Sequence, residues 1–143
     1  MANAIYTAFL NGILGSHATR VDLDADNIVL ALVDNAGAGG APVAATDDFW
    51  DDQNGSLVGS LSGNLASKTI GVVATGVFDA ADLAPAFTAV TGATVESLVM
   101  LKNTGVAGTS DLICFWDTAT GLPLTPNGGD VNITFNGSGI LKV

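Results

Sequence analysis

Three aspartates in the segment DLDADN are the residues best spaced to hold a metal ion. Asp22, Asp24 and Asp26 alternate like the first ligands of an EF-hand loop, whose carboxylate oxygens bind calcium. Such a loop also needs glycine at its sixth position and glutamate at its twelfth, where this chain has Asn27 and Val33. We therefore expect no metal site, and interpret the aspartates as the solvated face of a strand entry.

A second acidic group flanks two aromatic residues in the segment DDFWDD. Its carboxylates are Asp47, Asp48, Asp51 and Asp52. Glycoside hydrolysis uses two opposed carboxyl groups, one with its pKa raised by burial, and adjacent residues in a glycine-rich loop rarely provide that arrangement. We interpret the four as solvated charge. Phe49 and Trp50 are candidate contacts for a partner subunit, and the alternative is that they cap the core of their own subunit.

Nucleophilic and zinc chemistry have little material in this chain. His17 is its only histidine, and Cys114, its only cysteine, lies in an apolar run. One histidine and one cysteine do not meet the usual four-ligand requirement of zinc, and neither a nucleophile elbow nor a phosphate loop is present. We predict no catalytic, cofactor-binding or metal-binding residue, and thus no enzyme. A Cys114–His17 pair formed across the fold remains the alternative.

Composition predicts a single domain that associates with other copies of itself. A chain of 143 residues is long enough to bury one core without a second domain. Charged residues make up only 13% of it and apolar residues 48%, so its surface is weakly hydrated. We expect neighbouring subunits to cover part of that surface in a closed homo-oligomer, a trimer.

Net charge narrows the classes of partner. Fourteen acidic and four basic residues give a charge of −10, and the bases stand singly along the chain. Nucleic acid and anionic lipid are bound by clustered Lys and Arg, so neither is an expected partner. The N-terminus lacks the basic region of a signal peptide, and no apolar run is long enough to span a bilayer. We expect neither export nor membrane insertion.

Residues 1–15 predict a short helix. Ile5, Phe9 and Ile13 recur every fourth residue, and a second apolar row follows one position later. Gly15 is a suitable place for the helix to end. Because a short helix cannot keep such a stripe exposed, we expect Ile5, Phe9 and Ile13 to pack on a neighbouring subunit or on their own sheet.

Residues 21–143 predict a mainly β domain, an antiparallel sandwich or barrel of jelly-roll type. Ile28–Val33 is apolar on both faces, as expected of a central, covered strand. Residues 35–67 predict an irregular region with at most one short strand or helical turn. Residues 136–139 predict a hairpin turn that joins the last two strands. The further strands are predicted at 68–74, 77–79, 87–90, 95–102, 112–117, 131–135 and 140–143.

Several segments resemble a family of small virion structural proteins of tailed bacteriophages and prophages. They are MANAIYTAF, VLALVD, VFDAADL, AVTG, LVMLK and DTATGLPLTPNGGD. The resemblance covers most of the chain, with residues 35–67 the least similar part, and it implies a structural protein without catalytic residues. It further implies a capsid decoration or cement protein, made in the cytoplasm of the host bacterium, that binds the outside of the major capsid protein lattice. The acidic charge suits that outer surface better than contact with packaged DNA.

Two other functions stay open at this point. The first is a structural role in the tail, neck or baseplate of the same particle. The second is a glycan-binding module for host recognition, with Trp50 or Trp116 as a platform on which a sugar stacks. Within the loop DTATGLPLTPNGGD, Pro123 and Pro126 are candidate contacts with a neighbouring subunit, and the alternative is a rigid connector.

Overall fold

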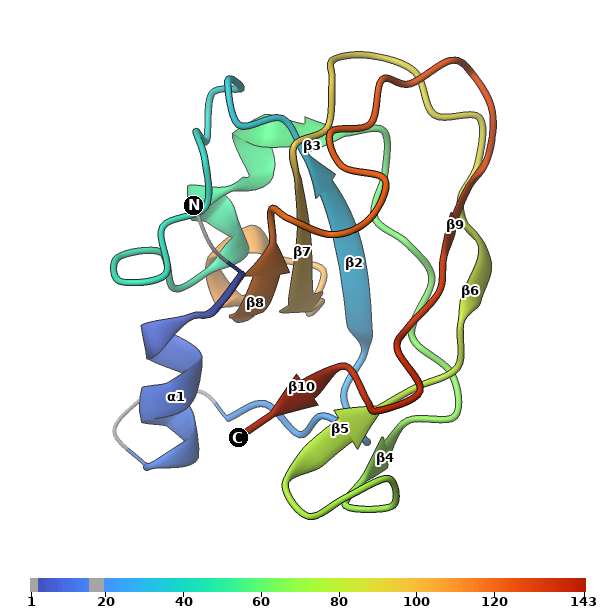
Figure 1. Cartoon of the computed structure of the whole chain (residues 1–143). Helices are drawn as coiled ribbons and strands as arrows, with labels where there is room; N and C mark the ends of the chain where they lie inside the picture. The colour runs from blue at the N-terminus through green and yellow to red at the C-terminus, as the bar shows by residue number, and fades with distance from the viewer. Residues whose placement is uncertain (1–2, 16–19) are drawn as a thin grey trace.

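The computed structural model describes residues 3–15 and 20–143 and shows a mainly β protein (Figure 1). Its strands pair antiparallel in three sheets, and a short helix lies near the N-terminus. The predicted fold class, an antiparallel β domain of sandwich type with an N-terminal helix, is therefore confirmed. None of the helices in the described ranges is long and apolar enough to cross a membrane.

A five-stranded sheet forms the centre of the molecule. Its strands, in spatial order, are β1 (Ala4–Ile5), β8 (Leu112–Trp116), β7 (Ser97–Lys102), β2 (Ile28–Val33) and β3 (Leu57–Val58). All six residues of β2 are buried, as its two apolar faces predict. β2 pairs with β7 along its whole length, from Ile28 opposite Lys102 to Val33 opposite Ser97.

Two smaller sheets complete the strands. The first joins β10 (Leu141–Lys142), β5 (Val77–Asp79) and β4 (Thr69–Ile70), and the second is a ribbon of β6 (Leu83–Phe87) and β9 (Val131–Ile133). The prediction of a final hairpin was wrong. Residues 136–139 do form a turn, closed by the Gly139 N–H donating to the Asn136 carbonyl at 2.8 Å. However, β9 pairs with β6 while β10 pairs with β5, so the turn connects two different sheets.

Several strands begin or end at other residues than predicted. Residues 68–74 shorten to β4 because Gly71 has a φ of +74°, which starts the turn into β5. The strand predicted at 87–90 is displaced, since β6 ends at Phe87. Residues 95–102, 112–117, 131–135 and 140–143 give β7, β8, β9 and β10, each shortened at its ends.

The predicted N-terminal helix is shorter than residues 1–15. Ala4 and Ile5 form β1, opposite Phe115 and Cys114, and the helix α1 spans Thr7–Ile13. Ile5 therefore does not belong to the helical stripe, which corrects the prediction. Sequence periodicity alone does not reveal this because a strand of two residues leaves no pattern. Gly15 has a φ of +86° just beyond the helix, as its expected end requires.

Residues 35–67 are irregular but packed, and they contain more regular structure than predicted. Two 3-10 turns, η1 (Trp50–Asp52) and η2 (Asn54–Ser56), precede β3, and a third, η3 (Ala107–Thr109), lies in the β7–β8 loop. Beyond β3, polar side chains take over the edge of β2. Ser62 Oγ accepts from the Leu30 N–H at 2.8 Å, and Asn64 Oδ1 accepts from the Ile28 N–H at 2.9 Å. Side chains thus supply the acceptors along that edge, while the main-chain N–H groups of Ser62 and Leu65 donate to the Leu30 and Ile28 carbonyls.

Different elements cover the two faces of the central sheet. On one face, Phe115 of β8 contacts Tyr6 at the start of α1, with ring centroids 5.4 Å apart. Trp116, the next residue, points to the opposite face because side chains alternate along a strand. The β6–β9 ribbon and the β10–β5–β4 sheet lie toward that second face (Figure 1). The core therefore continues on both sides of β2 and β7.

Candidate functional site

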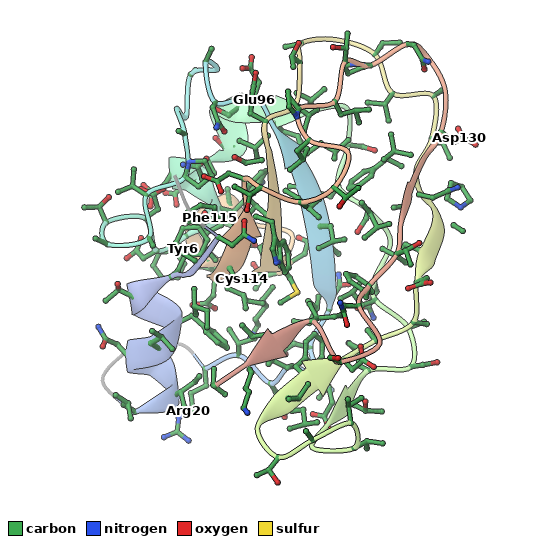
Figure 2. All side chains as sticks on the ribbon, in the orientation of Figure 1. Tyr6, Arg20, Glu96, Cys114, Phe115 and Asp130 are labelled. Carbon is green, nitrogen blue, oxygen red and sulfur yellow. The ribbon has the colours of Figure 1, made fainter. Side chains whose placement is uncertain are left out.

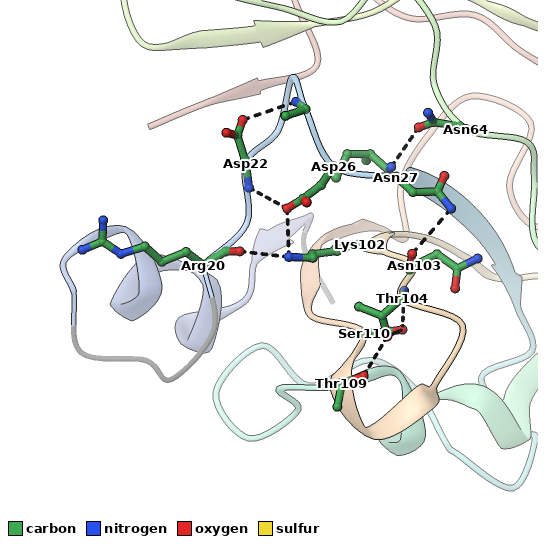
Figure 3. Close-up of polar contacts among 12 residues, drawn as sticks. Arg20, Asp22, Asp26, Asn27, Asn64, Lys102, Asn103, Thr104, Thr109 and Ser110 are labelled. Carbon is green, nitrogen blue, oxygen red and sulfur yellow. Dashed lines mark hydrogen bonds and ion pairs between the residues drawn. The ribbon is translucent and has the colours of Figure 1, made fainter.

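The DLDADN segment forms a turn whose carboxylates are bound within the protein (Figure 3). Asp26 Oδ2 accepts from the Asp22 N–H at 2.8 Å and lies 2.9 Å from Lys102 Nζ. Lys68 Nζ donates to the Asp26 main-chain carbonyl. These residues therefore close a turn ahead of β2 instead of lining the solvated face of a strand entry, which corrects that interpretation.

The other two carboxyl groups of this turn interact with each other. A hydrogen bond from Asp24 lowers the pKa of Asp22, and the same bond together with the negative charge of Asp22 raises the pKa of Asp24. Within residues 3–15 and 20–143, no group of three or more His, Cys, Asp or Glu side chains is arranged to hold a metal ion.

The DDFWDD segment packs against its own subunit. Trp50 is 6% exposed and its main-chain N–H donates to the Ser110 carbonyl at 2.9 Å, while the half-buried Phe49 forms an isolated β-bridge with Asp111. Trp50 is thus a core residue and not a surface contact, which corrects the prediction of a partner contact at this position. The reason is tertiary, since the β7–β8 loop folds over η1.

Carboxylates of this segment close turns. Asp47 Oδ2 accepts from the Val43 N–H at 2.8 Å and from Gln53 Nε2 at 2.9 Å. Asp52 Oδ2 accepts from the Asp48 N–H at 3.0 Å. These bonds hold an irregular loop in one conformation, so the acids act as local caps and not as an opposed acid–base pair.

Cys114 is a buried thiol in the middle of β8. Its side chain is 3% exposed, and burial raises its pKa well above its ordinary value, so the reactive thiolate is disfavoured. Burial, followed by the charge of Asp47, also raises the pKa of the Tyr6 hydroxyl. His17, the other half of the nucleophilic alternative, lies outside the described residues.

Most of the large apolar side chains that are exposed among the described residues belong to elements at one end of the molecule, which we name the basal surface, while Val43 and Val106 lie elsewhere. The basal surface is defined by the end of α1 and by the β4–β5 turn together with the last residue of the chain (Figure 1). Leu14 is 83% exposed and Val72 76% exposed. The other members are Leu10, Ile13, Ile70, Val73 and Val143. Large exposed apolar patches on other proteins often mark interaction sites, so this surface is a candidate one.

The apolar stripe predicted for the helix is therefore divided. Phe9 is 5% exposed and packs in the core of its own subunit, whereas Ile13 is 50% exposed. Ile5 is half-buried in β1. Of the three residues predicted to make helical contacts, only Ile13 is exposed, and Leu14 is more exposed still.

Charge is divided between the two ends. Lys102, the last residue of β7, lies opposite the first residue of β2 and forms an ion pair with Asp26. Arg20 lies at the same lower end of the molecule (Figure 2). Lys68 contacts the Asp26 carbonyl, and Lys142 belongs to β10, also at this end (Figure 1). All four bases of the chain thus gather near the basal surface, where they offset the nearby acids.

The opposite end, which we name the distal end, carries only acids among its charged residues in the described ranges. Asp34 follows β2, Glu96 precedes β7 and Asp117 follows β8. Figure 2 places Asp130 with Glu96 at this upper end. The molecule is consequently polarised, with unneutralised carboxylates at one end and exposed apolar side chains at the other.

The DTATGLPLTPNGGD loop is tied to the segment that precedes β7. Leu124 and Val95 exchange two backbone hydrogen bonds of 2.8 Å each. Val90 does the same with Gly128 and Gly129, at 2.8 and 2.9 Å. Pro123 is exposed and Pro126 half-buried. The loop is held on its inner side, and the predicted contacts of Pro123 and Pro126 with a neighbour remain predictions.

A groove runs between β9 and the central sheet, and the sequence predictions did not include it. It consists of two hollows of about 290 and about 310 Å³. Both are lined by Leu98 and by Thr120, Asn132 and Ile133, so they are continuous. The sequence signal for it is the alternation in VNITFN, which puts a polar residue at every second position.

No protein-family model matches this chain, and no curated protein matches it either.

Proposed function

We propose that this protein is a capsid cement protein of a tailed bacteriophage, which binds as a homotrimer to the outside of the major capsid protein lattice and stabilises it. The proposal rests on the polarised surface together with the resemblance of the sequence to phage virion proteins. In the proposed arrangement the basal surface contacts the shell and the distal end faces solvent.

The observation that best supports this proposal is the exposed apolar basal surface. Leu14, Val72 and Val143 expose 83%, 76% and 58% of their side chains at the same end of the molecule. Burying the β4–β5 turn and Val143 against the shell, and the end of α1 against neighbouring copies, gains about 25 cal/mol for each Å² of apolar area removed from water. The local bases offset the acids at this end, so docking there does not require burying a strong net charge.

The distal end suits contact with solvent. Asp34 and Glu96 are half-buried and Asp130 is exposed, and no basic residue lies beside them among the described residues. Their mutual repulsion disfavours association between two distal ends, so it directs each copy to dock by its basal surface. A particle coated in this way carries negative charge on its outside.

The mechanism is linkage between binding and the closed state of the shell. A ligand that binds the intact lattice more tightly than the opened one shifts the equilibrium toward the intact form. A difference of about 1.4 kcal/mol at one site is a factor of ten, and many equivalent sites on one particle multiply such factors. Weak individual contacts are therefore sufficient for strong overall stabilisation.

The test uses particles that lack this protein. We expect them to assemble, to rupture at a lower temperature than complete particles, and to recover when purified protein is added back. Quantification against the major capsid protein should give hundreds of copies in each particle. A handful of copies, or particles without tails, would place the protein in the neck, tail or baseplate, and intact particles that fail to attach to cells would favour host recognition.

A surface variant links this result to the basal surface. Val72→Asp adds a charge to the exposed β4–β5 turn, and we expect it to fold normally yet fail to bind or protect the particles. Val106→Asp is the matched control, because Val106 is 61% exposed but lies in the β7–β8 loop, outside the defined basal surface. Equal binding by the two variants would contradict the proposed docking surface.

A further inference from the structure

The floor of the groove is set by strand register. Leu32 of β2 lies opposite Leu98 of β7, and Leu98 lies opposite Trp116 of β8. Residues paired in this way point to the same face of a sheet, so the three side chains form a row across β2, β7 and β8. Trp116 is only half-buried, whereas Leu32 and Leu98 are 2% and 7% exposed. The indole is therefore the accessible end of an apolar floor.

The walls of the hollow next to Trp116 are polar and uncharged. Asn132, Thr134 and Asn136 line it from β9 and the turn that follows, and Thr120 lines it from the opposite loop. All four are exposed. An amide group offers both donors and acceptors, and a hydroxyl group offers one donor with two acceptor positions. These groups are suited to a ligand that carries many hydroxyl groups.

The charges of the lining residues narrow the class of ligand further. Of the described residues lining the hollow at Trp116, none carries a charge, although the chain has 14 acids and four bases. Asp130, at the far end of the adjoining hollow, is the single charged residue among the described lining of the whole groove. A phosphate or an acidic sugar would find no basic partner there, and a cation would find one carboxylate only at the distant end.

We propose that this groove binds a neutral saccharide, with one sugar ring packed on Trp116 and its hydroxyl groups bonded to Asn132, Thr134 and Thr120. Pockets for small ligands combine an apolar floor with a few placed polar groups, and an aromatic face accepts the C–H face of a sugar ring. The continuous second hollow, which reaches Leu32 and Leu124, allows further rings of an oligosaccharide to follow the groove. This inference is independent of the capsid proposal, because the groove lies outside the basal surface.

The test is a titration of the ¹⁵N-labelled full-length protein, followed by NMR. The probes are glucose, N-acetylglucosamine, maltotriose and chitotriose, with N-acetylneuraminic acid as the acidic comparator. We expect at least one neutral probe to bind with a millimolar Kd and to shift the Trp116 indole N–H signal and the amides of residues 130–136. Trp116→Phe assigns the indole signal and preserves an aromatic floor.

Asn132→Ala is the decisive variant, since Asn132 is exposed and the fold does not depend on its side chain. We expect about fivefold to tenfold weaker binding, the loss associated with one hydrogen-bonding group, and an unchanged melting temperature. Asn54→Ala, at an exposed asparagine of η2 away from the groove, should leave the affinity unchanged. Thr134→Val provides a second polar deletion within the groove.

Three results would overturn the proposal. The first is that no neutral probe shifts any signal at a probe concentration of about ten times a millimolar Kd. The second is shifts that persist unchanged in both Asn132→Ala and Thr134→Val. The third is binding of N-acetylneuraminic acid as tight as that of the neutral sugars, because the described lining has no base to receive its carboxylate.

Discussion

Lys102 Nζ lies 2.9 Å from Asp26 Oδ2, and this ion pair fastens the turn that precedes β2 to the last residue of β7. The same ammonium group donates to the Arg20 carbonyl at 3.1 Å. The two side chains are only 20% and 26% exposed, so solvent screens the pair less than it would a pair on an open surface. Lys102 thus ties both ends of residues 20–26 to β7.

We expect Lys102→Ala to lower the free energy of unfolding by about 1–2 kcal/mol, because the Asp26 carboxylate and the Arg20 carbonyl both lose a charged donor. Urea denaturation measures the change. Lys142→Ala is the matched control, since Lys142 is exposed on β10, and it should cost less than about 0.5 kcal/mol. Equal losses for the two variants would show that the ion pair contributes nothing specific.

Substitution of Phe9 should destabilise the protein strongly, whereas substitution of Leu14 should hardly change its stability. Phe9→Ala removes a side chain that is 5% exposed, and we expect a loss of about 3–5 kcal/mol in unfolding free energy. Leu14→Ala removes one that is 83% exposed, so stability should change by less than about 0.5 kcal/mol. Thermal melting of both variants checks this. A stable Phe9→Ala protein would mean that α1 does not pack as described.

Stability should fall in alkaline solution. Burial raises the pKa of Cys114 and of Tyr6 in the folded protein, so the unfolded chain releases these protons first. The stabilisation is fully present below about pH 8.5, where the unfolded thiol begins to titrate, and is lost as pH rises. Each group contributes a slope of up to about 1.4 kcal/mol per pH unit.

Cys114→Ala isolates the thiol contribution. Between about pH 8 and about pH 10, its unfolding free energy should fall less steeply with pH than that of the unchanged protein, because the unfolded variant has no thiol to deprotonate. Slopes from urea denaturation are compared, since the smaller side chain also lowers stability at every pH. Parallel slopes would indicate that Cys114 titrates alike in both states.

Calcium should leave the melting temperature unchanged. Lys102 neutralises Asp26, and the chain has Asn27 and Val33 where a calcium loop needs glycine and a bidentate glutamate, so the turn does not offer a complete set of calcium ligands. Scanning calorimetry in excess calcium and in excess chelator gives the measurement. A rise of many degrees with calcium would show that the turn rearranges around the ion.

The protein should form a trimer in solution. Leu10, Ile13 and Leu14 expose an apolar helix end that an isolated chain leaves uncovered. Light scattering at micromolar concentration should therefore give three times the chain mass, and Leu14→Asp should reduce it to one. A soluble monomer that binds particles normally would remove self-association from the proposal while leaving capsid binding intact.

Strong, local patterns determined much of this fold. Six consecutive apolar residues at Ile28–Val33 required a strand covered on both faces, and they form the centre of the largest sheet. Gly15 marked the end of the helix because its positive φ is costly for other residues. The excess of acidic over basic residues, the small fraction of charged residues and the lack of a complete calcium loop were likewise visible in the sequence.

Tertiary structure alone decided which partner each segment found. Ile5 joined a strand because the edge of β8 was available to it, and β10 paired with β5 although β9 precedes it in the chain. Trp50, which resembled a surface anchor, became a core residue when the β7–β8 loop closed over it. The groove depends on the register that aligns Leu32, Leu98 and Trp116, residues far apart in sequence. Sequence periodicity reports which face of an element is apolar, whereas the contact that covers this face depends on long-range pairing.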